Sequence, residues 1–274
     1  MGKEIFERKK EQLLMLNWES HIPQLVAGFT TKNGGVSESD FTSFNLGLHV
    51  NDKDSAVVGN RRILSEILDF PTSNWACSDQ VHDNKIVKVT KEHVGNGVFE
   101  YETSIKKTDG VYTKEPNILL TLCYADCVPL YFCAPKYKLI GMAHAGWKGT
   151  VKDIAGEMVR KWKEQEGVEP AEIHAAIGPS IGDCCYVVDD YVINFVNKVL
   201  NEKDTPPYSI ISEGQYSLNL KELNRLLMMK AGIPAANIQV SSYCTSCDKE
   251  LFFSHRRDKG KTGRMMSFIG RKED

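Results

Sequence analysis

Two side chains that could hold a metal ion flank a predicted β-hairpin. Cys127 directly precedes a predicted strand at 128–133, and His144 follows a second predicted strand at 139–143. The short connection between these strands is typical of an antiparallel hairpin. A turn centred on 135–136 would place Cys127 and His144 opposite each other at one end of the sheet. A thiolate and an imidazole in this arrangement suit Zn²⁺.

His82 is a candidate for the third ligand of such an ion. It lies in the polar segment 79–84, just before a predicted strand at 85–90. Polar surroundings favour a functional histidine, but the spacing does not place it near Cys127, so a surface histidine is the alternative. Three protein ligands would leave the fourth tetrahedral position of zinc open, as in catalytic rather than structural sites. Such an ion can activate water at neutral pH.

The same pair of side chains also permits a chemistry without metal. Cys127 could be the nucleophile of a cysteine hydrolase, with His144 as its base. A buried thiol and a histidine that never meet would instead have no joint function. Asp83 and Asp126 each stand beside a candidate ligand, so either could orient that ligand or carry a proton. The residues around 127 and 144 therefore predict a site and leave its reaction open.

The elements that must position these residues mix helices and strands irregularly. Apolar residues at helical spacing predict helices at 54–68, 150–165, 191–200 and 219–230. Apolar runs between turn residues predict strands at 85–90, 117–122, 128–133, 139–143, 172–177, 239–243 and 265–270. The segment 201–216 is expected to be a surface loop. Hairpins mixed with helices predict an α+β fold or a mixed-sheet α/β fold and not a regular doubly wound sheet, with one domain over residues 1–274.

Composition excludes several classes of protein. With 42% hydrophobic and 26% charged residues, the chain has the balance of a globular protein and not of a disordered one. A net charge of -2 argues against a nucleic acid or a membrane surface as partner. The sequence shows no apolar stretch of roughly 18 residues and no secretory signal. We therefore expect a cytoplasmic protein whose eight cysteines are thiols or metal ligands.

A series of short motifs follows in order along the chain: Phe29-Thr30-Thr31, Gly34-Gly35-Val36-Ser37, Phe44-Asn45-Leu46, Asn60-Arg61, Gln80-Val81-His82, Ala125-Asp126-Cys127-Val128-Pro129, His144-Ala145-Gly146-Trp147-Lys148-Gly149, Ile177-Gly178-Pro179-Ser180-Ile181-Gly182-Asp183-Cys184-Cys185-Tyr186, Phe252-Phe253-Ser254-His255-Arg256-Arg257-Asp258 and Thr262-Gly263-Arg264. Together they resemble the laccase-domain family, also called polyphenol oxidase or multicopper oxidase-like, and more recently purine nucleoside phosphorylase. The resemblance spans roughly residues 25–270.

The resemblance implies one catalytic Zn²⁺ held by His82, Cys127 and His144. It implies phosphorolysis of adenosine, inosine, guanosine and methylthioadenosine by inorganic phosphate, together with deamination of adenosine. The fold that it implies is a mixed β-sandwich with flanking helices. Lys32 and Lys148 depart from the family pattern, in which arginine is frequent, and they keep the charge but lose the bidentate fork of a guanidinium.

The histidine content argues against copper oxidation. A trinuclear copper cluster is built from many imidazoles, usually in close His-x-His pairs. The chain has seven histidines and no such pair, so the candidate ligands suffice for one ion and not for four coppers. A copper-dependent polyphenol oxidase is therefore a disfavoured alternative, and a binding protein without enzymatic activity is another alternative.

Candidates for substrate contact lie outside the proposed ligand set. Arg256, Arg257 and Arg264 surround a glycine-containing loop, and guanidinium groups match the geometry of phosphate. A solvated basic loop is the alternative for these arginines. The family pattern also favours substrate contact by Asn45 and Arg61, although surface polarity explains both equally well.

The remaining aromatic and cysteine signals are less specific. Trp147 and Tyr186 could stack on a purine or fill the core. Cys244 and Cys247 form a Cys-x-x-Cys motif without a second such motif elsewhere, so a second metal site or a redox role is possible from the spacing alone. The adjacent pair at 184–185 is expected mainly to pack.

Overall fold

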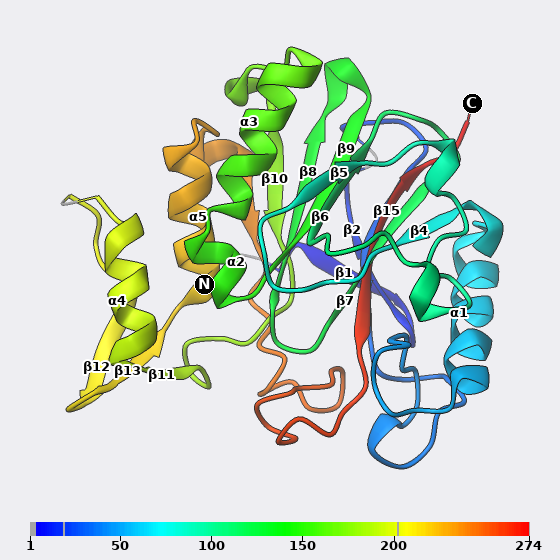
Figure 1. Cartoon of the computed structure of the whole chain (residues 1–274), viewed down its shortest axis with the longest axis horizontal. Coiled ribbons are helices and arrows are strands. Elements are labelled where there is room, and N and C mark those ends of the chain that lie inside the picture. The colour runs from blue at the N-terminus through cyan, green and yellow to red at the C-terminus, as the bar shows by residue number, and fades with distance from the viewer. Residues whose placement is uncertain (1–3, 19, 202, 274) are drawn as a thin grey trace.

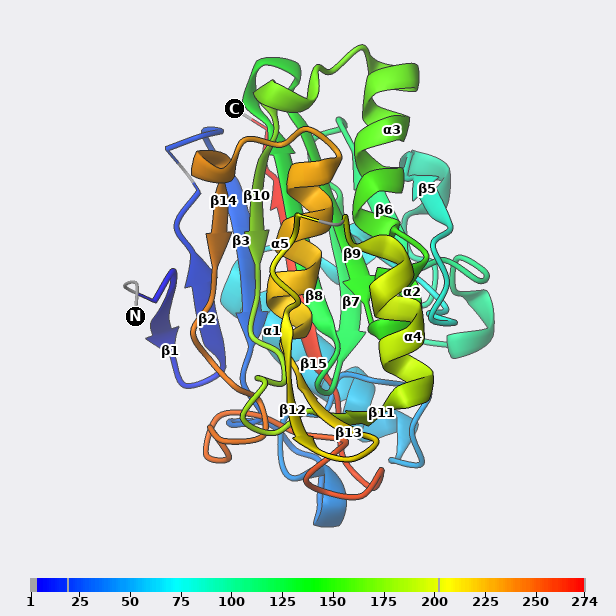
Figure 2. The same ribbon diagram turned by 90° about the vertical axis from the view of Figure 1, so that its left-hand side faces the viewer.

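Two six-stranded β-sheets pack face to face within residues 4–18, 20–201 and 203–273, the part of the chain that the computed structural model describes. Helices cover the outer faces of both sheets, as the two views in Figure 1 and Figure 2 show. Apolar side chains fill the spaces between helix and sheet and between the two sheets. The predicted mixed α+β sandwich with flanking helices is confirmed.

The first sheet combines strands from both ends of the chain. In spatial order it contains β1 (Phe6–Lys10), β2 (Leu13–Leu16), β3 (Leu25–Thr30), β15 (Met265–Arg271), β7 (Leu119–Tyr124) and β4 (Trp75–Cys77). Its strands are antiparallel except for β4, which runs parallel to β7. Helix α1 (Asp54–Leu68) covers the outer face, where Leu64 and Leu68 share a core with Phe268.

The second sheet carries the predicted hairpin at its centre. In spatial order it contains β14 (Ile238–Val240), β10 (His174–Ile177), β8 (Val128–Ala134), β9 (Leu139–Ala145), β6 (Gly110–Thr113) and β5 (Ile86–Lys88). Its outer apolar surface packs against α2 (Trp147–Val151), α3 (Ile154–Glu166), α4 (Asp190–Val199) and α5 (Leu220–Lys230). Both faces of this sheet are therefore buried, which explains the continuous apolar sequence of β8.

Residues of the central hairpin alternate between the two faces of the second sheet. Leu130 and Phe132 of β8 pack toward the helices, whereas Tyr131 and Cys133 belong to the core between the sheets. In β9, Met142 also lies in the core between the sheets. This alternation follows from the two-residue repeat of a pleated strand.

The register of the hairpin differs from the predicted one. Pro129 pairs with His144, so the turn is centred one residue later than expected. The chain makes a tight 3-10 turn over Pro135–Tyr137 and then places Lys138 in the left-handed region with φ 51°. Cys127 therefore does not pair directly with His144, as a turn centred on 135–136 would require, but both residues lie at the same end of the sheet, as predicted.

The predicted helix at 150–165 is two helices. The chain breaks between α2 and α3 at Asp153, which adopts a left-handed conformation with φ 59°. The Asp153 carboxylate then accepts a hydrogen bond from Gly156 N and caps α3. The other three predicted helices agree with α1, α4 and α5 to within one residue at each end. In the described residues, no helix is long and apolar enough to cross a membrane.

A small third sheet replaces most of the loop predicted at 201–216. Its strands are β11 (Val187–Asp189), β13 (Gln215–Leu218) and β12 (Tyr208–Ser212), all antiparallel. Most side chains of β12 and β13 are exposed or only half-buried, including Ile210 and Ile211, so these short strands lack the alternation of apolar and polar residues that marks a half-buried strand. Residue 202 of the predicted loop lies outside the described residues.

Arg61 anchors α1 from the buried side of the helix. It is 3% exposed, and its guanidinium donates hydrogen bonds to three backbone carbonyls. The acceptors are Leu46 O at 2.7 and 3.0 Å, Gly97 O at 2.6 Å and Val98 O at 2.8 Å. Arg61 therefore joins the helix to two loops that would otherwise bury unpaired carbonyl groups.

We expect Arg61→Met to lower the free energy of unfolding by about 3 kcal/mol, because the buried carbonyls of Leu46, Gly97 and Val98 lose the guanidinium donor. Equilibrium urea denaturation measures this change. Arg62→Met on the exposed side of the same helix is the matched control, with an expected effect of less than about 0.5 kcal/mol. Equal stability of the two variants would contradict the anchoring role of Arg61.

Candidate active site and metal centre

The three candidate ligands, His82, Cys127 and His144, meet at one end of the sandwich. Their ligand atoms all lie within 4.8 Å of one another, and 3.9 Å separates Cys127 Sγ from His82 Nε2. The two imidazole rings lie edge to face with centroids 4.8 Å apart. In a tetrahedral zinc site such atoms are about 3.4 to 3.6 Å apart, so small side-chain movements would close the group around one ion.

Strand geometry brings Cys127 and His144 to the same place. Cys127 immediately precedes β8, and His144 is the penultimate residue of β9. Side chains two or four residues apart along a strand point to the same face. Cys127 therefore shares the face of Tyr131, and His144 shares the face of Met142, which is the face between the sheets. There the ring of Tyr124, from β7 of the other sheet, packs against His144 with centroids 5.3 Å apart.

A buried carboxylate that the sequence analysis missed fixes two of the candidate ligands. Asp109 is fully buried, and His144 Nδ1 donates a hydrogen bond to its Oδ1 atom over 2.9 Å. Backbone N–H groups of Val81, His82 and Asp83 donate to the same carboxylate over 3.0 to 3.1 Å. Since Nδ1 of His144 is engaged in this way, Nε2 is the nitrogen left to bind a metal.

The loop that carries His82 is fixed to both sheets. The Gln80 side chain accepts from Cys123 N over 2.7 Å and donates to Cys123 O over 2.9 Å, which joins the loop to β7. The hydrogen bonds to Asp109 join it to the start of β6. His82 itself adopts a left-handed backbone conformation with φ 61°, which turns its ring toward Cys127 Sγ.

Gly146 leaves the space in which the thiol and the imidazole approach each other. A Cβ atom at this position would stand 2.9 Å from His82 Cδ2 and 3.0 Å from Cys127 Sγ. Any larger residue would therefore displace one of the two ligand groups. The donor set of one thiolate and two imidazoles, the Asp109 carboxylate behind His144 and this clearance together fit a zinc ion.

The Cys127 thiol and the His144 imidazole shift each other's pKa in opposite directions. Burial would raise the pKa of the Cys127 thiol, but the charge and hydrogen bonds of His144 and His82 outweigh burial and lower it to about 6. Burial would lower the pKa of His144, but Cys127 and Asp109 raise it to about 9. Both shifts favour the thiolate form of Cys127 and the protonated form of His144.

A pocket of about 520 Å³ opens over the three candidate ligands. Arg256, Arg264 and Lys148 line it together with Asp126, so cationic side chains outnumber carboxylates in its wall. Trp147 and Tyr186, which the sequence analysis named as possible stacking residues, line it as well. The Arg256 guanidinium lies over the Tyr186 ring at 5.0 Å from its centroid. The volume and the mixture of aromatic and cationic groups suit a small polar ligand.

The three arginines of the C-terminal loop do different things. Arg256 and Arg264 face the pocket, and the Arg256 guanidinium also donates to Val187 O over 2.7 Å. The guanidinium of Arg257 instead pairs with Asp258 and donates to backbone carbonyls, including Thr245 O at 3.0 Å. Arg257 therefore braces the loop and does not line the pocket.

Asn45 and Arg61 also lie outside the wall of this pocket. Asn45 is buried, and its Oδ1 atom accepts from Arg264 N over 2.8 Å and from Gly47 N over 3.1 Å. Arg61 holds α1 to the neighbouring loops, as described above. Asn45 thus positions the backbone of a pocket arginine, while its own side chain is engaged in hydrogen bonds within the protein.

Asp83 and Asp126, the acidic neighbours of His82 and Cys127, form their hydrogen bonds and ion pairs with other parts of the protein. Asp83 is half-exposed and forms an ion pair with Lys152 at 2.7 Å. The Asp126 carboxylate accepts from Thr245 Oγ1 at 2.6 Å, Ser254 Oγ at 3.0 Å and Arg256 N at 2.7 Å. Asp126 therefore ties the Cys127 loop to the C-terminal loop, and the carboxylate that orients a ligand is Asp109.

Asp109 and His49 are the main site residues that sequence analysis missed. Asp109 directly precedes β6, a short strand that was not predicted, and Gly110 pairs with Ala143. The next pair in that register is Asp109 and His144, whose backbone N–H donates to Asp109 O over 2.7 Å. The pairing rule used for the central hairpin would have found Asp109 once β6 was recognised. His49, in a loop, lines the pocket without any periodic signal.

Comparison with known proteins gives consistent matches over nearly the whole chain. Purine nucleoside phosphorylase YlmD of Geobacillus stearothermophilus is 53% identical over 249 residues, which cover 91% of each chain. Purine nucleoside phosphorylase YlmD of Bacillus subtilis is 52% identical over 264 residues, which cover 95% of each chain.

The fold matches solved structures equally well. The crystal structure of YlmD from Geobacillus stearothermophilus superposes with a TM-score of 0.97 and 49% identity, covering 99% of this chain and 100% of that one. Protein NMB0706 of Neisseria meningitidis matches with a TM-score of 0.83 at 28% identity, covering 96% of this chain and 100% of that one. The family model described as multi-copper polyphenol oxidoreductase laccase matches residues 26–272. The chain therefore belongs to this laccase-like family.

Proposed function

We propose that the chain is a zinc-dependent purine nucleoside phosphorylase. It would cleave adenosine, inosine, guanosine and methylthioadenosine with inorganic phosphate, and it would also deaminate adenosine. The observation that carries the proposal is the group of His82, Cys127 and His144 at the base of a pocket with cationic walls. The names of the relatives, which are purine nucleoside phosphorylases, support the same reaction.

His82, Cys127 and His144 would hold the metal ion, with Asp109 fixing the orientation of His144. Bound there, Zn²⁺ supplies Lewis-acid chemistry and one coordination position open to a ligand. Asp109 keeps a proton on His144 Nδ1 and thereby keeps Nε2 free to bind the ion. Copper oxidation fits less well, because this group offers two imidazoles and one thiolate to a single ion.

Phosphorolysis joins a phosphate oxygen to C1′ of the ribose while the bond from C1′ to the purine nitrogen breaks and the purine takes up a proton. Arg264, Arg256 and Lys148 would bind and orient the phosphate, since guanidinium and ammonium groups stabilise its negative charge. Tyr186 and Trp147 would contact the flat purine.

A second candidate function rests on the charges of the thiol and the imidazole. With its pKa lowered to about 6, Cys127 is a thiolate at neutral pH, as the nucleophile of a cysteine hydrolase must be. His144 beside it could donate a proton to a leaving group. The second imidazole on the same sulfur, His82, has no role in such a dyad, whereas it completes a metal site.

We expect His82→Ala, Cys127→Ala and His144→Ala each to lower the zinc content by one ion per chain and to abolish turnover, because two ligands hold the ion much more weakly than three. Inductively coupled plasma mass spectrometry measures the zinc. Cys123→Ser changes another cysteine that lines the same pocket and should retain the full zinc content. An unchanged zinc content in any of the three variants would remove that residue from the ligand set.

We expect Asp109→Asn to weaken zinc binding at this site by about 10- to 100-fold, because the ring of His144 loses its negatively charged partner. Competition with a chromophoric chelator measures the affinity. Asp83→Asn is the matched control, since Asp83 is an acidic neighbour of His82 that pairs with Lys152 instead. Equal affinities in the two variants would show that Asp109 does not act on the metal site.

The reaction is tested by incubating the zinc-loaded protein with inosine, with and without phosphate, and separating the products by chromatography. We expect hypoxanthine and ribose 1-phosphate only when phosphate is present, and inosine from adenosine when phosphate is omitted. His144→Ala is expected to give neither product. If the zinc-loaded protein formed no product from inosine, adenosine or methylthioadenosine, the phosphorylase proposal would fail and the thiol hydrolase would become the better candidate.

A further inference from the structure

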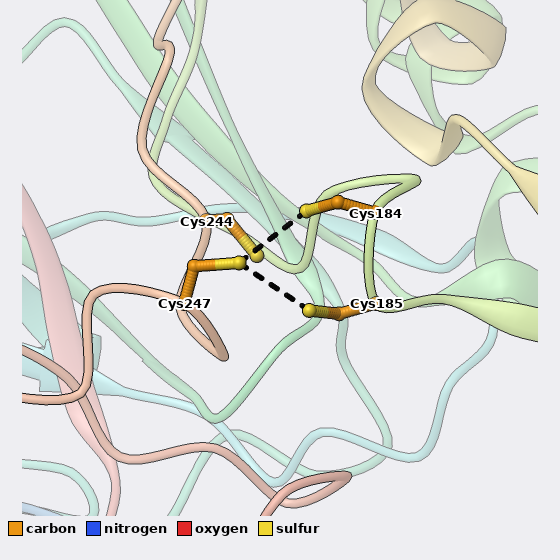
Figure 3. Close-up of side chains that lie close together, drawn as sticks. All are labelled: Cys184, Cys185, Cys244 and Cys247. Carbon is orange, nitrogen blue, oxygen red and sulfur yellow. Dashed lines mark hydrogen bonds between the residues drawn. The ribbon is translucent and has the colours of Figure 1, made fainter.

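Four cysteines from two distant segments meet outside the pocket. Cys184 and Cys185 lie in the loop between β10 and β11, and Cys244 and Cys247 lie in the segment that follows β14. Their sulfur atoms all lie within 4.8 Å of one another. Figure 3 shows the four side chains pointing toward a common centre from two loops. Sequence spacing alone indicated only the Cys-x-x-Cys motif of Cys244 and Cys247, which is half of this group.

The distances suit a tetrahedral ion better than a pair of disulfides. Cys247 Sγ lies 3.5 Å from Cys184 Sγ and 3.4 Å from Cys185 Sγ. Neighbouring sulfurs around a zinc ion are about 3.8 Å apart when each bond is about 2.3 Å long. Because Cys247 Sγ lies at similar distances from two other sulfurs, the group resembles the ligands of one central ion and not two separate disulfide pairs.

The backbone around Cys244 is arranged to stabilise a thiolate. Gly182 N donates a hydrogen bond to Cys244 Sγ over 3.2 Å, and the N–H groups of Ser246 and Cys247 also point at this sulfur. Cys244 is buried, so these donors serve the protein and not the solvent. A metal-bound thiolate needs such donors, because its remaining lone pairs carry negative charge.

A buried ammonium group lies close to the same cluster. Lys221 is 8% exposed and donates to Ser241 O at 2.9 Å and Tyr243 O at 2.7 Å, in the segment that leads to Cys244. Burial lowers the pKa of Lys221, whereas the nearby Cys244 and Cys184 thiols act to raise it. Four thiolates around a divalent ion carry a net charge of about -2, which the lysine would partly neutralise.

We propose that Cys184, Cys185, Cys244 and Cys247 bind one structural Zn²⁺ ion, separate from the pocket. Four protein ligands leave no coordination position for a substrate, so the ion would stabilise structure and not take part in the reaction. Zinc is the divalent ion that four thiolates in tetrahedral geometry most often hold, and it has no redox chemistry of its own.

This ion would join the two loops that form one wall of the pocket. The first loop carries Ile181 and Tyr186, and the second leads to Arg256, all three of which line the pocket. Protein contacts already join these loops at Thr245, whose N–H donates to Ser180 O over 3.1 Å. The zinc site would add a second, stronger connection and hold Tyr186 beneath the Arg256 guanidinium.

Zinc analysis of the full-length protein tests the proposal. We expect the wild-type chain to contain one more zinc ion than the double variant Cys184→Ser/Cys247→Ser, in which both exchanged cysteines are exposed. Cys133→Ala, a buried cysteine in β8 outside the cluster, is the control and should match the wild type. Equal zinc contents in the wild type and the double variant, iron in place of zinc, or a disulfide within the group by mass spectrometry would each overturn the proposal.

Cobalt substitution distinguishes this site from the one in the pocket. In the Cys127→Ser variant, Co²⁺ bound by four thiolates is expected to give an intense sulfur-to-cobalt absorption band, even though the pocket site has lost its only thiolate. The same band should be absent when Cys184→Ser/Cys247→Ser is combined with Cys127→Ser. If the Cys127→Ser variant showed no such band, the four cysteines would not form a metal site, whatever the outcome for the phosphorylase reaction.

Discussion

The carboxylate of Asp109 accepts hydrogen bonds from the His144 ring and from three consecutive backbone N–H groups of the His82 loop. Burial would raise its pKa, but the His144 ring and these N–H groups outweigh burial and keep the group ionised. Hydrogen bonds to this one carboxylate therefore hold together the end of β9, the start of β6 and the His82 loop, which belongs to neither sheet. The position of two metal-ligand candidates follows from this contact.

The sandwich supplies the remaining constraint. Because strand residues alternate between faces, a side chain at the end of β9 and one just before β8 both reach the space between the sheets. Tyr124 of the opposite sheet closes that space behind His144. The site is therefore built where the two sheets meet at their ends, and the loops that follow the strands provide its open side and its cationic groups.

Local patterns predicted the helices α1, α4 and α5 and the central hairpin, because these elements have clear apolar periodicity and clear ends. The proximity of Cys127 and His144 could be predicted because antiparallel pairing relates residues by position alone. Lys138, in a left-handed conformation after the tight turn, shifted the register by an amount that no pattern showed. Asp109 stayed hidden because β6 is short, and the buried role of Arg61 stayed hidden because its partners are backbone carbonyls from distant loops.

Gly146 has no Cβ atom, and this absence leaves just enough room for the Cys127 thiol and the His82 imidazole to approach each other. A chain could therefore keep His82, Cys127 and His144 unchanged and still lose the ability to bring them together through one substitution at this neutral, unreactive position. Among sequences of this kind, an intact site therefore requires a glycine here as well as the three candidate ligands. Chains that retain the fold but have lost the chemistry would be recognised by what stands in its place.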